Sequence, residues 1–177
     1  MTIIEQLIYL DRMTIIEQSK DAVTAPSTTA SLQFLTDKTA IAELVFTVAR
    51  AMDARDWELL AACFAPDPEG DFATGTVRGL AAVLDEYKAF LTPLDVTQHL
   101  VGNVVSALDG DSATSHATFQ AQHVRTDADG SGRYLLGGDY DDILVRTPSG
   151  WRIQKRRVSG LWSAGDPTVF ARPLTRA

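Results

Sequence analysis

Cysteine, histidine and long apolar runs are all scarce in this chain. The one cysteine, Cys63, excludes an intrachain disulfide and a zinc site built from several cysteines. No apolar run reaches the roughly 18 residues of a membrane-spanning helix, so we expect no membrane partner. Basic residues are outnumbered, with 16 Lys and Arg against 23 Asp and Glu, for a net charge of −7. Because phosphate backbones attract basic surfaces, we also expect no nucleic-acid partner.

The rest of the composition is that of a globular protein with one domain. The 177 residues are 45% hydrophobic and 22% charged, which suffices for a sizeable core. The first 36 residues differ: MTIIEQ occurs at residues 1–6 and again at 13–18, and residues 24–31 (TAPSTTAS) have the composition of a linker. We expect residues 1–36 to form a flexible N-terminal extension and residues 37–177 to form the domain. Glu5 and Asp11 interrupt what a signal peptide needs, so we expect a cytoplasmic protein.

Helical periodicity dominates the first half of the domain. Apolar residues recur at offsets of three and four from Ile41 to Met52, after Asp37 as the expected helix cap. A short second helix is expected at residues 57–64, closed by two prolines, and a short strand at residues 71–78. A third helix is expected at residues 80–91, where Pro93 stops it.

The apolar period changes to two in the second half. Four alternating segments predict strands at residues 97–108, 112–126, 133–146 and 151–162, with turn sequences between them. Helices followed by a run of antiparallel strands indicate an α+β fold. We therefore expect a curved, mostly antiparallel sheet wrapped around about three helices, with a pocket between the two layers.

Four segments, taken in order, resemble a known family. They are residues 37–64 (DKTAIAELVFTVARAMDARDWELLAACF), 98–103 (QHLVGN), 138–142 (GDYDD) and 150–153 (GWRI). Together they resemble the SnoaL-like domain of the nuclear-transport-factor-like superfamily, over residues 37–166. The resemblance implies a cone-shaped α+β fold. It says less about the reaction, since relatives include polyketide cyclases, ketosteroid isomerase, scytalone dehydratase, lindane dehydrochlorinase and non-catalytic binding domains.

The resemblance also points to a pair of catalytic residues. In the dehydratases and the dehydrochlorinase, an aspartate near the end of the first long helix pairs with a histidine on the sheet. Asp53 in AMDARD and His99 in HLVGN match those positions. Helical periodicity alone favours Asp56, which also reads as the cap of the next helix. The tyrosine that the dehydratase pattern places beside the aspartate is absent, because Met52 stands there.

The chemistry of such a pair is simple. An imidazole with a carboxylate at its other nitrogen can take a proton at neutral pH, and the carboxylate stabilises the imidazolium that forms. This supports dehydration, β-elimination or double-bond isomerisation, and none of these needs a metal or an organic cofactor. A buried His–Asp pair can also serve only to stabilise a fold.

Three further polar residues are weighed from strand parity. Asn103 shares a strand face with His99, so we expect it beside His99 in the pocket wall. His123, on the next strand, either holds a leaving hydroxyl or faces the solvent. His116 has the opposite parity on that strand, and we expect it to be exposed.

Arg156, Tyr140 and Trp162 complete the candidate substrate-binding residues. The dehydrochlorinase pattern points to Arg156, within QKRR, as a cation for developing negative charge, and a solvated strand face is the alternative. The two aromatic residues belong either to the core or to the pocket wall. A metal site is not expected, because the acidic residues of GDYDD have no His or Cys neighbour in sequence.

These features predict a cofactor-independent lyase or isomerase, of the dehydratase or elimination type, acting on a small, largely apolar molecule. Two alternatives stay open: a non-catalytic ligand-binding or oligomerisation domain of the same fold, and a polyketide-cyclase-like enzyme. The expected partners are a small-molecule substrate and further copies of the chain. The second expectation arises because a sheet covered by helices on one side leaves a partly apolar outer face.

Overall fold

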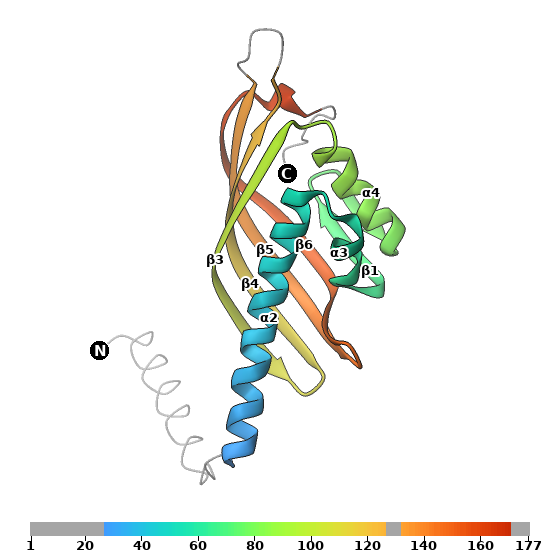
Figure 1. Ribbon diagram of the computed structural model, residues 1–177, viewed down its shortest axis with the longest axis vertical. Coiled ribbons are helices and arrows are strands. Elements are labelled where there is room, and N and C mark those ends of the chain that lie inside the picture. Colours follow the sequence, from blue (N-terminus) through green and yellow to red (C-terminus); the bar gives the residue numbers. More distant parts are fainter. Residues whose placement is uncertain (1–26, 127–131, 171–177) are drawn as a thin grey trace, which may run out of the picture. The chain divides into compact units, whose positions relative to one another are not determined.

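The computed structural model describes residues 27–126 and 132–170, and the chain divides into two compact units, residues 1–34 and 35–177. The described part of the first unit is only the start of helix α2 (Thr28–Ala54). The second unit holds the rest of that helix and the sheet (Figure 1). Its further elements are α3 (Trp57–Ala62), β1 (Phe64–Phe72), β2 (Gly75–Arg78), α4 (Leu80–Leu91), β3 (Val96–Asp109), β4 (Ser112–Val124), β5 (Arg133–Thr147), β6 (Gly150–Gly165) and the 3₁₀ helix η1 (Pro167–Val169).

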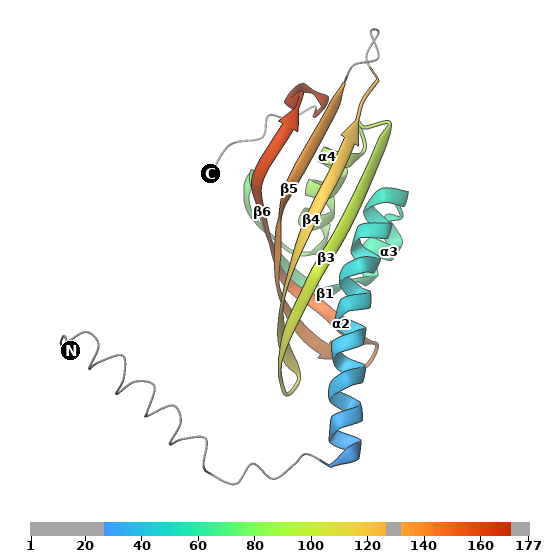
Figure 2. The same ribbon diagram turned by 90° about the vertical axis from the view of Figure 1, so that its left-hand side faces the viewer.

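One six-stranded sheet, in the order β2-β1-β6-β5-β4-β3, forms the larger layer. Its neighbouring strands are antiparallel except for β1 and β6, which run parallel. Irregular register in β3 and at two places between β5 and β6 bends the long strands, as bulges do. Figures 1 and 2 show α3, α4 and the second-unit part of α2 on one side of this curved sheet. The predicted α+β fold, a curved and mostly antiparallel sheet around three helices, is confirmed.

The core lies between the helices and the inner face of the sheet. The predicted helical stripe is buried, from Ile41 through Val48 to Met52, and Val83 and Leu91 of α4 are buried as well. Along β4 buried and more exposed residues alternate, as expected for a strand with one covered face. Burying a side chain of this size stabilises a fold by about 1.5–3 kcal/mol, so this stripe holds helix and sheet together.

Two boundaries differ from the sequence prediction. Helix α2 begins at Thr28, inside the expected linker, so Asp37 is an interior residue of the helix and not its cap. The expected strand at residues 71–78 is a hairpin of β1 and β2. Pro66 and Pro68 lie in β1 where its register with β6 is irregular. No residue of β6 is paired with them there, so the sheet tolerates two residues without an N–H group. Within residues 27–126 and 132–170, no helix is long and apolar enough to cross a membrane. Residues 1–26, which carry the MTIIEQ repeat, lie outside the described residues.

Candidate functional site

The end of α2 fixes the position of Asp53. The helix stops at Ala54 because Arg55 adopts a left-handed backbone conformation with a φ of 55°. The Arg55 guanidinium then donates to the carbonyl oxygen of Leu91, at 3.2 Å, and to that of Leu94. Asp56 caps α3, with its side chain accepting the Leu59 N–H at 2.9 Å. Periodicity alone favoured Asp56, but α2 ends at Ala54, before that residue.

Asp53 and His99 are joined by two hydrogen bonds. The His99 Nδ1 lies 2.6 Å from Oδ1 of Asp53, and the His99 backbone N–H donates to Oδ2 at 2.9 Å. The imidazole is 6% exposed and the carboxylate side chain 26% exposed. A carboxylate at Nδ1 holds the proton on that nitrogen, so Nε2 is the nitrogen that can accept a proton. The structure places the two residues at the expected distance, and their catalytic role remains a prediction.

A cavity of about 760 Å³ lies beside this pair, and His99 is part of its wall. Most of the wall is aromatic or aliphatic and comes from α2, α4, the sheet and the residue that follows η1. These apolar and aromatic wall residues are Met52, Phe72, Ala73, Tyr87, Phe90, Leu91, Phe119, Ala121, Tyr134, Leu136, Tyr140, Val158, Leu161, Trp162 and Phe170. A few polar groups in a mostly apolar hollow are typical of a site for a small molecule.

His123 lies inside this cavity and not on the surface. Its ring packs edge-to-face on His99 with 5.7 Å between the centroids, and its Nδ1 lies 3.0 Å from the Thr97 hydroxyl. Burial, with a smaller contribution from His99, lowers the pKa of His123 to about 3. His123 is therefore neutral over the physiological range, and it can accept or donate a hydrogen bond without becoming charged. Thr97, its partner, gave no signal in the sequence.

Asn103 is the clearest correction to the expected site. It is exposed, its φ is 51°, and its side-chain amide donates to the Thr118 hydroxyl at 3.0 Å. The register of β3 shifts between Gly102 and Val105, so parity counted from His99 fails at this point. Asn103 does not border the cavity.

Arg156 faces inward, but its charge is already matched. It is fully buried, and its guanidinium donates to both oxygens of Asp142 at 2.7 and 2.6 Å. Burial opposes its charge, yet the Asp142 carboxylate outweighs burial, and the pKa of Arg156 lies above its ordinary value. Arg156 does not border the cavity, so the expectation that it contacts the substrate is not met in this geometry. The sequence pattern of β6 alone could not reveal Asp142, which lies opposite Arg156 on β5.

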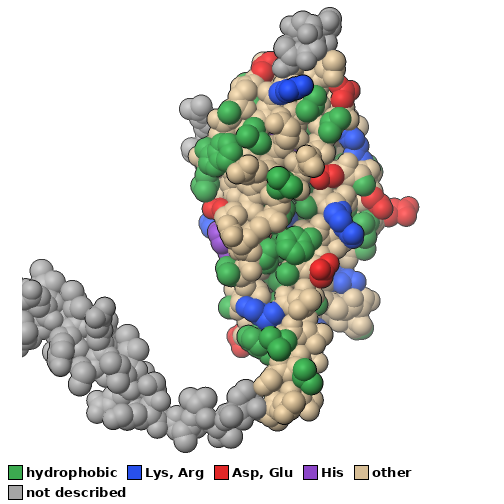
Figure 3. All heavy atoms as spheres, turned by 60° about the vertical axis from the view of Figure 1, so that its left-hand side comes forward, with side chains coloured by type: hydrophobic (Ala, Val, Ile, Leu, Met, Phe, Trp, Pro, Cys, Tyr) green, Lys and Arg blue, Asp and Glu red, His purple; other side chains and the backbone are tan. Residues whose placement is uncertain are grey.

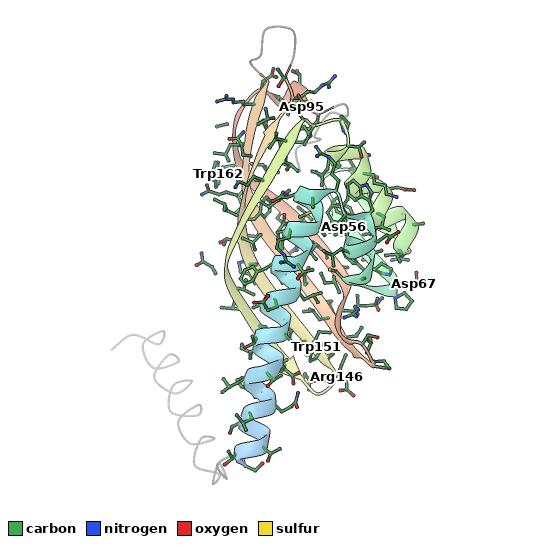
Figure 4. The ribbon with its side chains drawn as sticks, viewed as in Figure 1. Asp56, Asp67, Asp95, Arg146, Trp151 and Trp162 are labelled. Carbon is green, nitrogen blue, oxygen red and sulfur yellow. The ribbon has the colours of Figure 1, made fainter. Side chains whose placement is uncertain are left out.

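Tyr140 and Trp162 both border the cavity. Tyr140 is buried and stacks on Phe119, with 4.3 Å between the ring centroids. Trp162 is 46% exposed and lies over Gly137, where a Cβ atom would collide with the indole. Figure 4 shows Trp162 in the upper part of the sheet.

His116 is on the opposite face of the sheet, as expected. Its Nδ1 lies 2.9 Å from Asp141, and its side chain is 44% exposed. The Asp141 hydrogen bond raises the pKa of His116, against a weaker effect of burial. Within the described residues there are thus two His–Asp pairs, and of these the one at His99 borders the aromatic cavity. Over the part of the chain that the structure describes, no cluster of three or more His, Cys, Asp or Glu could hold a metal ion.

Phe170 is a wall residue that the sequence reasoning missed. It follows η1, is 7% exposed, and packs edge-to-face against His123, Phe90 and Tyr134 at 5.0–5.8 Å between centroids. The signal available in the sequence was the apolar pair Val169-Phe170 after Pro167. In the structure both residues are buried.

This fold and cavity define a class of protein, and comparison with known sequences assigns the family. Residues 33–157 match the SnoaL-like domain, and the chain belongs to that family. The uncharacterized protein Rv2910c of Mycobacterium tuberculosis is 31% identical over 128 residues, which are 71% of this chain and 86% of that protein.

Two solved structures agree with the fold. A scytalone dehydratase candidate from Novosphingobium aromaticivorans has a TM-score of 0.68 at 23% identity, covering 83% of this chain and 99% of that chain. A hexachlorocyclohexane dehydrochlorinase has a TM-score of 0.68 at 20% identity, covering 81% and 97%. At these identities the likeness establishes the fold. The SnoaL-like family expected from the sequence motifs is confirmed by the match over residues 33–157.

Proposed function

We propose that the protein is a cofactor-independent lyase or isomerase in which His99 is the general base and Asp53 orients and stabilises it. The observation that carries the proposal is the 2.6 Å bond between Asp53 and His99 Nδ1, which leaves Nε2 as the accepting nitrogen beside the cavity. The substrate is a small, largely apolar molecule, because most of the cavity wall is aromatic or aliphatic.

In the elimination form of the reaction, Nε2 of His99 takes a proton from a carbon of the substrate. The electron pair of that C–H bond becomes a C=C bond, and the bond from the neighbouring carbon to its hydroxyl or halide breaks. A leaving hydroxide takes the proton back from His99 and departs as water, whereas a halide leaves as the anion with the proton passing to solvent. In an isomerisation the proton returns to a different carbon instead. Asp53 stabilises the imidazolium in each case.

His123 is suited to hold the leaving oxygen. It lies beside His99, and its low pKa keeps it from competing for the substrate proton. The Thr97 hydroxyl fixes one of its nitrogens, so the other is free to bond an oxygen in the cavity.

The names of the two similar structures support this reaction class, because a dehydratase and a dehydrochlorinase both remove a small molecule across a carbon–carbon bond. The polyketide-cyclase-like alternative calls for an acid on the sheet. Asp142 of the sheet is held by Arg156 and does not border the cavity, whereas Asp71 of β1 does border it and is the sheet acid that this alternative would use. Asp53 is favoured over it because Asp53 is hydrogen-bonded to His99 of the cavity wall.

The test is a panel of small apolar β-hydroxy ketones and halogenated hydrocarbons, with loss of water or hydrogen halide followed by mass spectrometry. We expect His99→Ala to reduce turnover about 10²–10⁴-fold, the usual effect of removing a positioned general base. Asp53→Asn should also reduce it, because an amide holds the ring but stabilises the imidazolium poorly.

The second His–Asp pair supplies matched controls. His116→Ala and Asp141→Asn remove a similar pair from the other face of the sheet, and both should retain full turnover. Wild-type turnover in folded His99→Ala protein would refute the mechanism. If panel compounds bind but none is converted by the wild-type protein, the binding-domain alternative is the better account.

A further inference from the structure

The Tyr140 phenol ring is fixed by its buried neighbours Phe119 and Arg156. Its ring stacks on Phe119 with an angle of 11° between the planes, and the Arg156 guanidinium carbon lies 4.6 Å from its centroid. Arg156 is in turn locked by two hydrogen bonds to Asp142. Since Phe119, Arg156 and Asp142 are all buried, the ring has little freedom to turn away.

The hydroxyl of Tyr140 has no hydrogen-bond partner among residues 27–126 and 132–170. A sealed hydroxyl of this kind is costly, because a buried donor without a partner loses its bonds to water. The polar atoms that are sealed and unpartnered in the described structure are Tyr87 Oη, Ser115 Oγ and Arg156 Nη1. Tyr140 Oη is not among them, and Tyr140 borders the cavity, so open space lies beside its hydroxyl.

Tyr140 is also within electrostatic reach of the His–Asp pair. Burial raises the pKa of Tyr140 far above its ordinary value, against the Arg156 charge, and Asp53 is among the charges that raise it further. The phenol therefore stays protonated at any physiological pH, and it remains a hydrogen-bond donor. His99 and Tyr140 border the same cavity from β3 and β5.

We propose that the Tyr140 hydroxyl donates a hydrogen bond to an oxygen of the substrate, and that this site selects molecules carrying a carbonyl or enolisable oxygen. The proposal deepens the proposed function, since it names the substrate class of the same cavity. A proton next to a carbonyl is acidic, and its removal by His99 places negative charge on the carbonyl oxygen. A fixed phenol in an apolar hollow stabilises that charge without having to reorganise. Simple halogenated alkanes have no such oxygen and would leave the donor unused.

The two other tyrosines of the cavity are less suited to this role. The Tyr87 hydroxyl is sealed from open space. Tyr134 packs edge-to-face against Phe170, and its register partner on β4 is His123, so it belongs to the end of the cavity near η1. Tyr134 is therefore the natural control residue, being a cavity tyrosine without the Phe119 and Arg156 contacts.

The experiment measures binding, so it does not depend on knowing the substrate. Calorimetric affinities of para-nitrophenol, ionised by adjusting the pH above its pKa, are compared with those of nitrobenzene, which has the same ring and no anionic oxygen. In Tyr140→Phe the stacked ring remains and only the hydroxyl is lost. We expect the phenolate affinity to fall about 10-fold or more, as for a hydrogen bond to a charged group, with nitrobenzene affinity changed less than about twofold. Tyr134→Phe should change neither affinity by more than about twofold.

Each other result overturns the proposal. Equal affinities in wild type and Tyr140→Phe would mean that the hydroxyl touches no ligand oxygen. Equal weakening of both probes would reduce Tyr140 to a wall residue, and failure of the wild-type cavity to bind the phenolate would exclude an oxyanion site. These outcomes are independent of the turnover of His99→Ala. The binding experiment can therefore refute the role of Tyr140 without refuting that of His99, and the turnover experiment can refute the role of His99 without refuting that of Tyr140.

Discussion

At the residue scale, the candidate site is a set of polar groups whose states are fixed by their neighbours. Asp53 orients His99, Thr97 orients His123, and Asp142 neutralises Arg156. Each pairing joins residues distant in sequence, from strands or helices that only the folded sheet brings together. The charge and shape of the cavity wall therefore depend on Asp53, Thr97 and Asp142 as much as on the residues that they hold.

The buried His123 makes a specific prediction about acid stability. Its pKa of about 3 in the folded state lies below its ordinary 6.5, so the unfolded chain takes up the proton first as the pH falls. The stability that neutral His123 preserves is complete above about pH 6.5 and is lost progressively down to about pH 3. In His123→Gln the free energy of unfolding should fall less steeply with acid, by up to about 1.4 kcal/mol per pH unit.

Urea unfolding between about pH 7 and pH 4 measures this slope for both proteins. His99 and Asp53 are the titratable groups that face His123, and both are present in the two proteins compared. His116→Gln is the control, because the pKa of His116 is raised and its removal should not flatten the acid limb. Parallel curves for wild type and His123→Gln would show that His123 is not protected from protonation.

Strand parity predicts the direction of a side chain only where the strand is regular. Parity grouped His123 with Phe119 and Ala121 and left open whether their shared face is inward; β4 is regular over its length, and all three residues are buried. Asn103 fails because an irregularity in β3, invisible in the sequence, shifts the register after Gly102. Arg156 faces inward as one reading required, but the Asp142 carboxylate that matches its charge comes from another strand. The pairing of His99 with Asp53 came from the family resemblance and not from periodicity.

At the element scale, α2 carries Asp53 and is tied to the rest of the fold at two points. Just after its C-terminal end, Arg55 donates to the carbonyl oxygens of Leu91, the last residue of α4, and of Leu94. Some four turns earlier, the buried Asp37 accepts two hydrogen bonds from Arg146, both at 2.7 Å, and one from the Trp151 indole at 3.0 Å. Figure 4 shows Arg146 and Trp151 together at the lower end of the sheet. A helix held at both points gives Asp53 a fixed height along the sheet.

Asp37→Asn should therefore destabilise the fold by about 1–3 kcal/mol, because it removes the charged acceptor of a buried network. Asp111→Asn is the matched control. Asp111 bonds the same arginine at 3.0 Å but its side chain is 86% exposed, and exposed pairs contribute only about 0–1 kcal/mol. Urea midpoints at constant slope give both changes. Equal losses in the two variants would contradict the anchoring role of Asp37.

The sequence predicts that a helix exists more reliably than it predicts the residue at which the helix begins. Helix α4 was predicted at its observed bounds, since an apolar face and Pro93 define it. Helix α2 starts nine residues before Asp37, because no breaker lies between Thr28 and Asp37, and the small polar residues that suggested a linker are accommodated in a helix. The β1–β2 hairpin was taken for one strand, since its turn around Ala73 and Thr74 carries no strong turn pair.

At the scale of the whole molecule, the outer face of the sheet is the surface that the helices leave uncovered. It exposes Val96, Leu100 and Val105 of β3 and Ile143 of β5, each 46–67% exposed. Figure 3, which brings this side forward, shows groups of hydrophobic side chains separated by polar and backbone atoms. The charges in the middle of the face are already paired, since Asp141 bonds both His116 and Arg157. A second copy could therefore pack here without leaving these charges unmatched.

We accordingly predict that the protein forms a homodimer or larger oligomer through this outer face. Exposed apolar side chains on a broad sheet face favour a symmetric contact between two copies. Replacing Leu100 and Val105 by glutamate adds two negative charges per copy at the contact, and should raise the dissociation constant about 10-fold or more. Leu59→Glu, on α3 and 37% exposed, is the control and should leave assembly unchanged. Light scattering and sedimentation at micromolar concentration measure the masses. A wild-type chain that is only monomeric, or a double variant that assembles as well as the wild type, would remove this face as the interface.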